Sequence, residues 1–310
     1  MTVLSPAVVA AIDDLELAAR VVVEGLRAGG HRSPFHGYGA DFQQHRPYRA
    51  GDDLKYLDWK VYARSNRLYT RQFRETTNVS VMLVLDTSAS MAYPENAAAG
   101  LSKFRYASIV AASLAYLASE QGNAVGLMTM TNGELAYWPA RSGRVHLRSL
   151  IARVDRLIPS GTWQPVTVIR RAAELLQRRG LMMVISDFYD EESETQRELR
   201  HVVQHGHDVA MLHVVAPEER ELRFTTQVEL RDLESGARRL VEPATAATAY
   251  RAALSQFLER CRHFAQHEGI DYGLLDTGEP PERTLRDYLV RRSARQASPS
   301  LPSAQHATQR

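Results

Sequence analysis

The spacing of apolar residues changes character along the chain. Residues 6–28 repeat apolar positions at helical spacing, whereas residues 31–78 are rich in Arg, Tyr, Gly and Asp and have no clear helical period. Further on, unbroken apolar runs at 79–85 (VSVMLVL) and 181–186 (LMMVIS) are typical of strands that are buried on both faces. Amphipathic helical stretches separate such runs. The alternation predicts an α/β fold with a mostly parallel, doubly wound sheet of the Rossmann type, covered by helices on both faces.

The same patterns locate the remaining elements. Asn132-Gly133, between two strand-like runs, predicts a β-hairpin. A turn at Glu234-Ser235-Gly236 predicts a small β-hairpin insertion within 222–242. The other strands are expected at 124–131, 134–138, 208–215 and 271–276, and the helices at 101–120, 144–157, 165–179, 245–267 and 281–292, with an acidic helix beginning near 190.

Three regions follow from this pattern. Residues 1–78 are an N-terminal extension that comprises a helix and an Arg/Asp-rich segment, and residues 79–292 are the α/β domain. Residues 293–310 are a polar tail with two prolines and no periodicity, which we expect to be disordered. A chain of 310 residues can bury a full core without support from disulfides or metals.

Composition narrows the possible classes of protein. The chain has 38 Lys and Arg against 36 Asp and Glu, so the net charge of +2 argues against a dedicated nucleic-acid binder. The single cysteine, Cys261, allows no intrachain disulfide, and residues 1–27 lack the pattern of a signal peptide. No apolar run approaches the roughly 20 residues that span a bilayer. We therefore expect a cytoplasmic protein without a membrane span.

Oxygen-bearing side chains follow two of the predicted buried strands. Asp86, Ser88 and Ser90 come directly after the first strand, and Asp187 comes directly after the strand that ends at residue 186. Thr162 lies in a loop between them in the sequence. Because ligands of an open parallel sheet bind beyond the carboxyl ends of its strands, we expect these residues to meet at one edge. Two carboxylates and three hydroxyls suit Mg²⁺ or Mn²⁺ rather than Zn²⁺.

This set of residues resembles the metal-ion-dependent adhesion site of von Willebrand factor A-type domains. The resemblance implies that one divalent cation is held through a first loop, a second-loop Thr and a third-loop Asp. It also implies an open coordination position that an acidic side chain of a partner protein fills, so that the site serves adhesion rather than catalysis. The third loop reads Ser186-Asp187-Phe188, where the family more often has Thr-Asp-Gly. The residues that the resemblance assigns to the cation are Asp86, Ser88, Ser90, Thr162 and Asp187.

A second resemblance covers most of residues 31–190. The chain runs from Arg46-Pro-Tyr48-Arg-Ala-Gly51-Asp52-Asp53 through Asp58-Trp59 and Ala63-Arg64 into the Asp-x-Ser-x-Ser strand. This order resembles the DUF58 family, bacterial proteins with a von Willebrand A-like domain. The resemblance implies a non-enzymatic partner of a MoxR-type AAA+ ATPase in the assembly or maturation of protein complexes. Many relatives carry N-terminal membrane helices, which this sequence lacks.

The Arg/Asp-rich segment has two possible roles. We favour an ion-pair network in which arginines pair with Asp52 and Asp53 and Trp59 packs beneath, so that the segment docks on the sheet. The alternative is a docking surface beside the metal site. The arginines that could pair with the two carboxylates are Arg46, Arg49 and Arg64.

Two interpretations belong to other classes of function. A metal-dependent phosphoester hydrolase of the haloacid-dehalogenase type would use Asp86 as its nucleophile, but the expected general acid two residues on is Ser88. A nucleic-acid-binding protein would use residues 46–74, where eight cations, three anions and interleaved aromatic residues occur. Nucleic acid is not the partner that we expect. His201, His205 and His207 lack the spacing of a zinc site and are expected at the surface.

Overall fold

A six-stranded sheet forms the centre of the molecule. The computed structural model describes residues 8–9, 11–28, 39–49, 57–76, 79–94, 101–176, 179–189, 192–221 and 227–297. The strands of the sheet are β3 (Ser80–Leu85), β4 (Ala124–Thr131), β5 (Glu134–Arg141), β6 (Leu181–Ser186), β7 (Asp208–Val215) and β10 (Asp271–Asp276). They lie in the order β10-β7-β6-β3-β4-β5, and all neighbouring pairs are parallel except β4 and β5.

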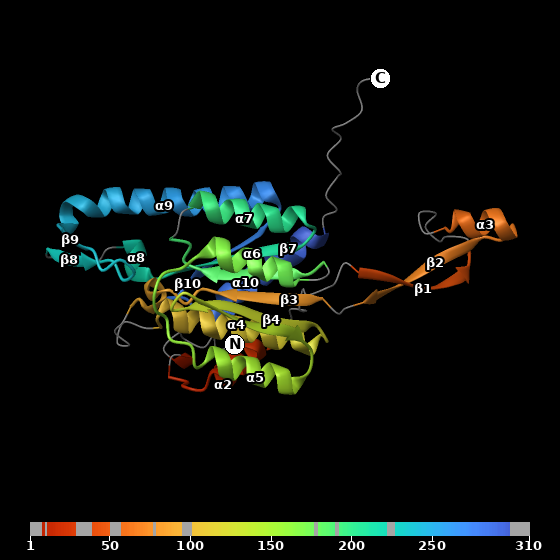
Figure 1. Ribbon diagram of the computed structural model, residues 1–310, viewed down its shortest axis with the longest axis horizontal. Helices are drawn as coiled ribbons and strands as arrows, with labels where there is room; N and C mark the ends of the chain where they lie inside the picture. The colour runs from red at the N-terminus through yellow and green to blue at the C-terminus, as the bar shows by residue number, and fades with distance from the viewer. Residues whose placement is uncertain are drawn as a thin grey trace, which may run out of the picture.

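Helices cover both faces of this sheet (Figure 1). One face carries α2 (Leu15–Ala28), α4 (Lys103–Glu120), α5 (Arg144–Val154) and α10 (Pro281–Ala297). The other face carries α6 (Pro165–Leu175), α7 (Glu192–Gln204) and α9 (Pro243–Glu268). The predicted class, an α/β fold with a mostly parallel, doubly wound sheet, is confirmed.

The inner strands β3 and β6 are almost entirely apolar because both of their faces are buried. In β3, Leu83 and Leu85 belong to the core under α4, whereas Met82 and Val84 belong to the core on the α6 side. This alternation follows from the strand geometry, in which successive side chains point to opposite faces. The turn between β4 and β5 has Asn132 and Gly133 at positive φ (52° and 80°), as the predicted hairpin requires.

Two helices differ in extent from the sequence patterns. The N-terminal pattern begins at residue 6, whereas α2 begins at Leu15. The helix α10 continues to Ala297, beyond the predicted end at residue 292. Residues 298–310 of the predicted tail lie outside the described residues. The predicted hairpin insertion is present as β8 (Val228–Arg231) and β9 (Arg238–Val241), which pair antiparallel. A short helix, α8 (Pro217–Glu221), precedes it.

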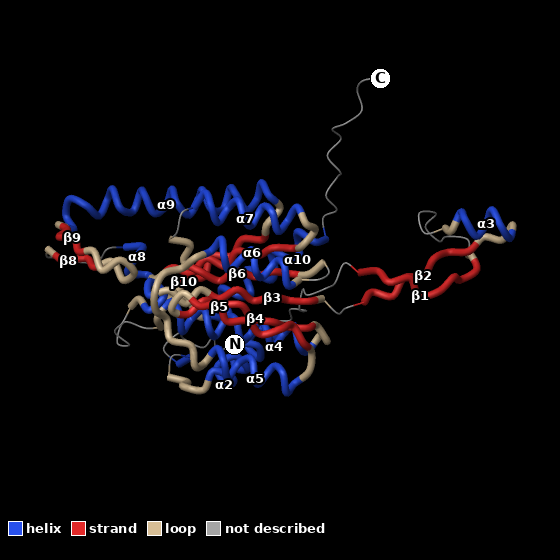
Figure 2. The backbone as a smooth tube through the Cα atoms, viewed as in Figure 1, coloured by secondary structure: helices blue, strands red, loops and turns tan. Residues whose placement is uncertain are grey.

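The segment without a helical period contains a hairpin that the sequence patterns missed. Strands β1 (Gly39–Pro47) and β2 (Tyr69–Thr76) pair antiparallel, and α3 (Trp59–Ser65) lies between them in the chain. We call residues 39–49 and 57–76 the arm and the other described residues the body. Figures 1 and 2 show the arm extending away from the sheet.

The arm corrects one expectation. Trp59 does not pack beneath the segment, because its side chain is 61% exposed and contacts the Tyr62 ring edge to face at 6.3 Å. The two carboxylates of the expected ion-pair network, Asp52 and Asp53, lie outside the described residues. By contrast α2, from the same N-terminal region, packs against α4 and α10 in the body.

Candidate metal centre

The predicted metal ligands lie where the winding of the sheet reverses. From β3 the chain crosses to β4 through α4 on one face, and from β6 it crosses to β7 through α7 on the other. The carboxyl ends of β3 and β6 therefore border a crevice of the kind in which α/β proteins bind ligands. Asp86 follows β3 and Asp187 follows β6, so both carboxylates lie at this crevice.

Hydrogen bonds join four of the five predicted ligands into one network. Asp86 is 1% exposed, and its two oxygens accept the Ser88 N–H at 2.8 Å and the Ser186 hydroxyl at 2.5 Å. The Ser88 and Ser90 hydroxyls lie 3.0 Å apart. The Ser90 hydroxyl donates to Oδ2 of Asp187 at 2.9 Å. Residues that are 97 positions apart in the sequence thus meet at one point, as the spacing predicts.

The fifth predicted residue, Thr162, is near this network but does not join it. Its loop is tied to the first loop, because the Ala89 N–H donates to the Gly161 carbonyl at 2.9 Å and the Ser160 N–H donates to the Thr87 carbonyl at 2.7 Å. The Thr162 side chain itself is exposed. In the part of the chain that the structure describes, no hydrogen bond links its hydroxyl to the other four residues.

A buried lysine that no sequence motif indicates also belongs to the site. Lys103, the first residue of α4, is 1% exposed, and its Nζ lies 2.7 Å from Oδ2 of Asp187 and 2.6 Å from Oε1 of Glu219. Burial alone would lower the pKa of Lys103, but the charges of Asp187 and Glu219 outweigh it and raise the pKa. One signal was available, because Lys103 is one of only three lysines in an arginine-rich chain.

Two opposing effects act on the pKa of Glu219 in its ion pair with Lys103. Burial raises the pKa of the Glu219 carboxyl, and the ammonium offsets only part of this rise. The second carboxylate oxygen of Glu219 accepts the Ala216 N–H at 2.8 Å. Because both oxygens have donors within hydrogen-bond distance, we assign the charged pair.

The third loop explains how Phe188 replaces the glycine that is usual in adhesion sites. Phe188 has φ 54°, a left-handed conformation that glycine adopts without strain and that costs other residues about 1–2 kcal/mol. The Phe188 ring is buried against His213, with centroids 5.3 Å apart, and its N–H donates to the Ser186 hydroxyl at 2.9 Å. The packing therefore holds the backbone turn that Asp187 needs, and the departure from Thr-Asp-Gly leaves Asp187 in place.

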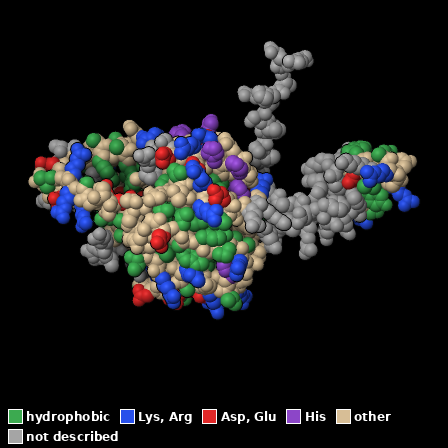
Figure 3. Space-filling model, viewed as in Figure 1, with side chains coloured by type: hydrophobic (Ala, Val, Ile, Leu, Met, Phe, Trp, Pro, Cys, Tyr) green, Lys and Arg blue, Asp and Glu red, His purple; other side chains and the backbone are tan. Residues whose placement is uncertain are grey.

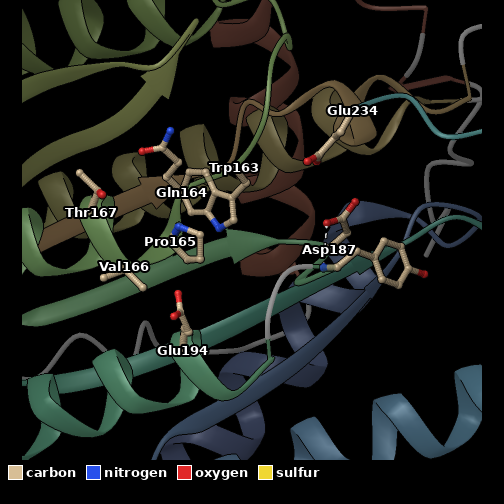
Figure 4. Close-up of a pocket in the computed structure, with 9 residues that line it drawn as sticks. Trp163, Gln164, Pro165, Val166, Thr167, Asp187, Glu194 and Glu234 are labelled. Atoms are coloured by element: carbon tan, nitrogen blue, oxygen red, sulfur yellow. Dashed lines mark hydrogen bonds between the residues drawn. The ribbon is translucent and has the colours of Figure 1, made fainter. Parts of the chain in front are cut away.

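The site carries more negative than positive charge. Burial and the charge of Asp187 raise the pKa of the Asp86 carboxyl, although hydrogen bonds from Ser186 and Ser88 oppose the rise. A further carboxyl, Glu234 from the β8–β9 turn, lines the same cavity as Asp187 (Figure 4). Of the four carboxyl groups Asp86, Asp187, Glu219 and Glu234, only Asp187 and Glu219 form ion pairs with Lys103 in the described part of the chain.

The donor set fits a hard divalent cation. All of the predicted ligands offer oxygen atoms, and the surplus of carboxyl groups is what a cation would neutralise. Among the described residues, no group of three or more His, Cys, Asp or Glu side chains is arranged to hold a metal. A cation at this site would therefore depend on the serine hydroxyls as well as on the carboxylates.

The three histidines are placed as the sequence suggested. Figure 3 shows a group of histidines on the face that carries α7. Nδ1 of His205 lies 2.7 Å from the His201 carbonyl, and Nδ1 of His207 accepts the Gly180 N–H at 3.3 Å. His201, His205 and His207 line a shallow surface groove with Arg170 and Glu198.

Comparisons with known proteins support the family assignment. Residues 44–263 match the family described as "Protein of unknown function DUF58". Uncharacterized proteins from Mycobacterium bovis (Mb1516) and Mycobacterium tuberculosis (Rv1480) are 30% identical to this chain over 267 residues, which is 83% of each chain.

Solved structures with some similarity include BatB and a VWA domain. BatB from Bacteroides thetaiotaomicron has a TM-score of 0.47 and 15% identity, and the match covers 70% of this chain and all of BatB. The SpRpn10 VWA domain has a TM-score of 0.35 and 16% identity over 44% of this chain and 75% of that domain. Because both TM-scores are low, the fold assignment rests on the strand order of this chain.

A membrane span was not expected, and every helix in the described ranges is too short or too polar to cross a bilayer. The DUF58 match covers the arm from residue 44, the metal centre and the β8–β9 hairpin in a single stretch. Together with the mycobacterial relatives, it confirms the resemblance that the Arg/Asp-rich segment and the Asp-x-Ser-x-Ser strand suggested. The chain belongs to the DUF58 family.

Proposed function

We propose that this chain is a non-enzymatic, divalent-cation-dependent protein-interaction module. The cation, Mg²⁺ or Mn²⁺, would be held by Asp86, Ser88, Ser90, Thr162 and Asp187, and it would hold an acidic side chain of a partner protein. The observation that carries the proposal is the hydrogen-bonded convergence of Asp86, Ser88, Ser90 and Asp187 at the crevice, in surroundings with excess negative charge.

Each residue has a defined task in this proposal. A bound Mg²⁺ keeps coordination positions that an outside carboxylate can occupy. Asp86 is held by two hydrogen bonds, so its carboxylate is fixed before a cation arrives. Lys103 orients Asp187 and offsets part of the repulsion between the carboxylates of Asp187 and Glu219.

The burial of Asp86 favours binding over phosphoester hydrolysis. A carboxylate nucleophile must reach the phosphorus atom, whereas Asp86 is 1% exposed and both of its oxygens already accept hydrogen bonds. Ser88 occupies the position where the hydrolase would need its proton donor. For these reasons we prefer adhesion to catalysis.

The resemblance to the family supplies the candidate partner. We propose a MoxR-type AAA+ ATPase, an acidic client protein, or both, met in the cytoplasm during assembly or maturation of protein complexes. An acidic surface on the partner suits the site, because a carboxylate both coordinates a hard cation and balances its charge.

Calorimetric titration with MgCl₂ and MnCl₂ tests the cation site. We expect the wild-type chain to bind one cation and Asp86→Asn to bind about 10–100-fold more weakly. Glu174→Gln is the matched control, because it changes an exposed carboxylate on α6 to its amide and should leave binding unchanged. Equal cation binding by all three proteins, or no binding in any, contradicts the proposal.

Capture of the partner tests the second half of the proposal. The tagged chain is incubated with a purified MoxR-type ATPase from the same genome, with Mg²⁺ or with EDTA. We expect a complex that EDTA abolishes and that Asp86→Asn does not form. Metal-dependent turnover of a phosphoester panel by the wild type would instead favour the hydrolase.

A further inference from the structure

The turn of the β8–β9 hairpin holds Glu234 in a fixed position. Oδ1 of Asp232 accepts the N–H groups of Glu234 at 2.8 Å and Ser235 at 2.9 Å. Gly236 closes the turn with φ 72°, and its N–H donates to the Asp232 carbonyl at 2.9 Å. An aspartate that caps two consecutive amides in this way rigidifies a turn. The hydrogen bonds of this turn therefore hold the backbone of Glu234 in a defined conformation.

This turn brings Glu234 to the cation site. Glu234 and Asp187 line one cavity of about 380 Å³, together with Trp163 and Tyr189 (Figure 4). The Glu234 carboxyl is close enough to the Ser90 and Ser88 hydroxyls that both oppose the rise of its pKa. These are the two hydroxyls that the proposed function assigns to the cation. The Glu234 carboxyl thus lies beside residues that the proposed function assigns to the cation.

The charges in the cavity are consistent with a cation between the carboxylates. The lining includes three acids, Asp187, Glu194 and Glu234, and among its residues there is no lysine, arginine or histidine. Burial raises the pKa of Glu234, and the charge of Asp187 adds to the rise, whereas the two serine hydroxyls oppose it. A divalent cation held by Asp187 and the serines would turn this repulsion into attraction.

We propose that Glu234 is an internal acidic ligand of the cation site, so that the β8–β9 hairpin occupies the coordination position that a partner's carboxylate must take. This inference rests on the proposed function, because it needs a cation at the serines and Asp187. It adds Glu234 to the site, and it adds a competition between Glu234 and the partner's carboxylate. The family resemblance implies neither. A partner binds when its own acidic side chain replaces Glu234 and displaces the hairpin.

The competition has a predictable direction. A ligand on the same chain has an effective concentration in the millimolar range or above when its tether is short and preorganised. A weak acidic partner therefore does not displace Glu234, whereas a partner with further contacts does. Removing the Glu234 carboxylate should open the position to any small acidic ligand.

The experiment compares Glu234→Gln with Glu229→Gln, a matched control that removes a charge from the exposed strand of the same hairpin. Calorimetry with MnCl₂ first fixes a concentration that saturates each protein. A fluorescein-labelled peptide, Gly-Gly-Glu-Gly-Gly, is then titrated at that concentration and followed by fluorescence anisotropy. We expect Glu234→Gln to bind this peptide at least about tenfold more tightly than the wild type or Glu229→Gln.

Hydrogen–deuterium exchange gives a readout that does not depend on the peptide. Addition of Mn²⁺ should slow amide exchange across residues 228–241 in the wild type and in Glu229→Gln. The same addition should have no effect on this hairpin in Glu234→Gln. Glu234→Ala serves as a second variant, because an amide oxygen can still coordinate a cation weakly.

The outcomes separate this inference from the proposed function. If the wild type binds Mn²⁺ in an Asp86-dependent manner but the two glutamate variants behave alike in both assays, Glu234 is not a ligand and the proposed function stands. If the wild type binds no Mn²⁺, the proposed function falls and the inference falls with it. The inference is supported if Glu234→Gln binds the peptide more tightly than the wild type and Glu229→Gln do. It also requires that Mn²⁺ protects the hairpin amides in those two proteins but not in Glu234→Gln.

Discussion

The edge of the sheet around Asp86 and the arm are built by different kinds of contact. At the sheet edge, residues from distant parts of the sequence are buried together, as in the contact of Ser90 with Asp187. In the arm, pairing is local, between β1 and β2, and among the arm residues with described side chains only Leu57 and Thr70 are buried. The comparison teaches that the buried contacts and the proposed cation site belong to the body, while the arm offers exposed side chains.

The largest difference should come from the buried ammonium. Lys103→Met leaves Asp187 and Glu219 buried without their counter-charge, and breaking such a pair costs about 3–5 kcal/mol of unfolding free energy. Arg64→Met, on the exposed surface of the arm, should change it by less than about 0.5 kcal/mol. Urea unfolding followed by circular dichroism measures both. Similar losses in the two variants would erase the distinction between the regions.

The next contrast uses one substitution in two places. Leu83→Ala removes a fully buried side chain from β3 and should cost about 2–5 kcal/mol. Leu68→Ala removes the same atoms from an arm residue that is 41% exposed, and should cost less than about 0.5 kcal/mol. Both unfolding free energies come from the same urea titrations. A Leu68→Ala loss that matches Leu83→Ala would show that the arm is packed as the body is.

The same contrast explains what the sequence predicts well. The strands β3 and β6 are unbroken apolar runs, and such runs identify a buried parallel sheet without knowledge of its neighbours. Because parallel strands end at a common edge, the meeting of Asp86, Ser88, Ser90 and Asp187 also follows from the sequence alone. The arm could not be predicted in this way, since its strands lack an apolar face that burial would require.

Two parts of the site lay beyond sequence patterns. Lys103 opens an amphipathic helix, where a lysine is ordinarily solvated, and only the crossing of α4 beneath the crevice buries it against Asp187. Glu234 is in a surface turn, and its position over the serines depends on how the hairpin packs. Neither contact has a sequence signature, because neither Lys103 nor Glu234 directly follows a buried strand of the central sheet.

A pH titration also distinguishes the two regions. The body buries the imidazole of His213, whereas no histidine side chain is described as buried in the arm. Burial lowers the pKa of His213 from 6.5 to about 4. The unfolded chain therefore takes up the proton first, and stability that is present above pH 6.5 falls by about 1.4 kcal/mol per pH unit as pH drops toward 4. At pH 5 the loss from this group is about 2 kcal/mol.

The measurement is the slope of unfolding free energy against pH from 7 to 5. His213→Gln should lower this slope by about 1 kcal/mol per pH unit relative to the wild type, because the contribution of Asp86, whose pKa is raised to about 7, has the opposite sign and remains in both proteins. His267→Gln changes an exposed histidine at the end of α9 and should keep the wild-type slope. Parallel slopes for all three proteins would show that His213 titrates normally in the folded state.

The smallest effect is expected where the arm is most exposed. Trp59 and Tyr62 form an edge-to-face pair at the surface, which is the kind of aromatic platform that could stack on bases. The chain as a whole has a net charge of only +2, so we expect weak binding to single-stranded DNA and a shallow dependence on salt. The double variant Trp59→Ala, Tyr62→Ala should bind as the wild type does.

Fluorescence anisotropy with a labelled oligonucleotide at several salt concentrations measures this binding. A slope of log K against log salt near −3, which corresponds to about four neutralised phosphates, together with weaker binding by the double variant, would make the arm a nucleic-acid surface.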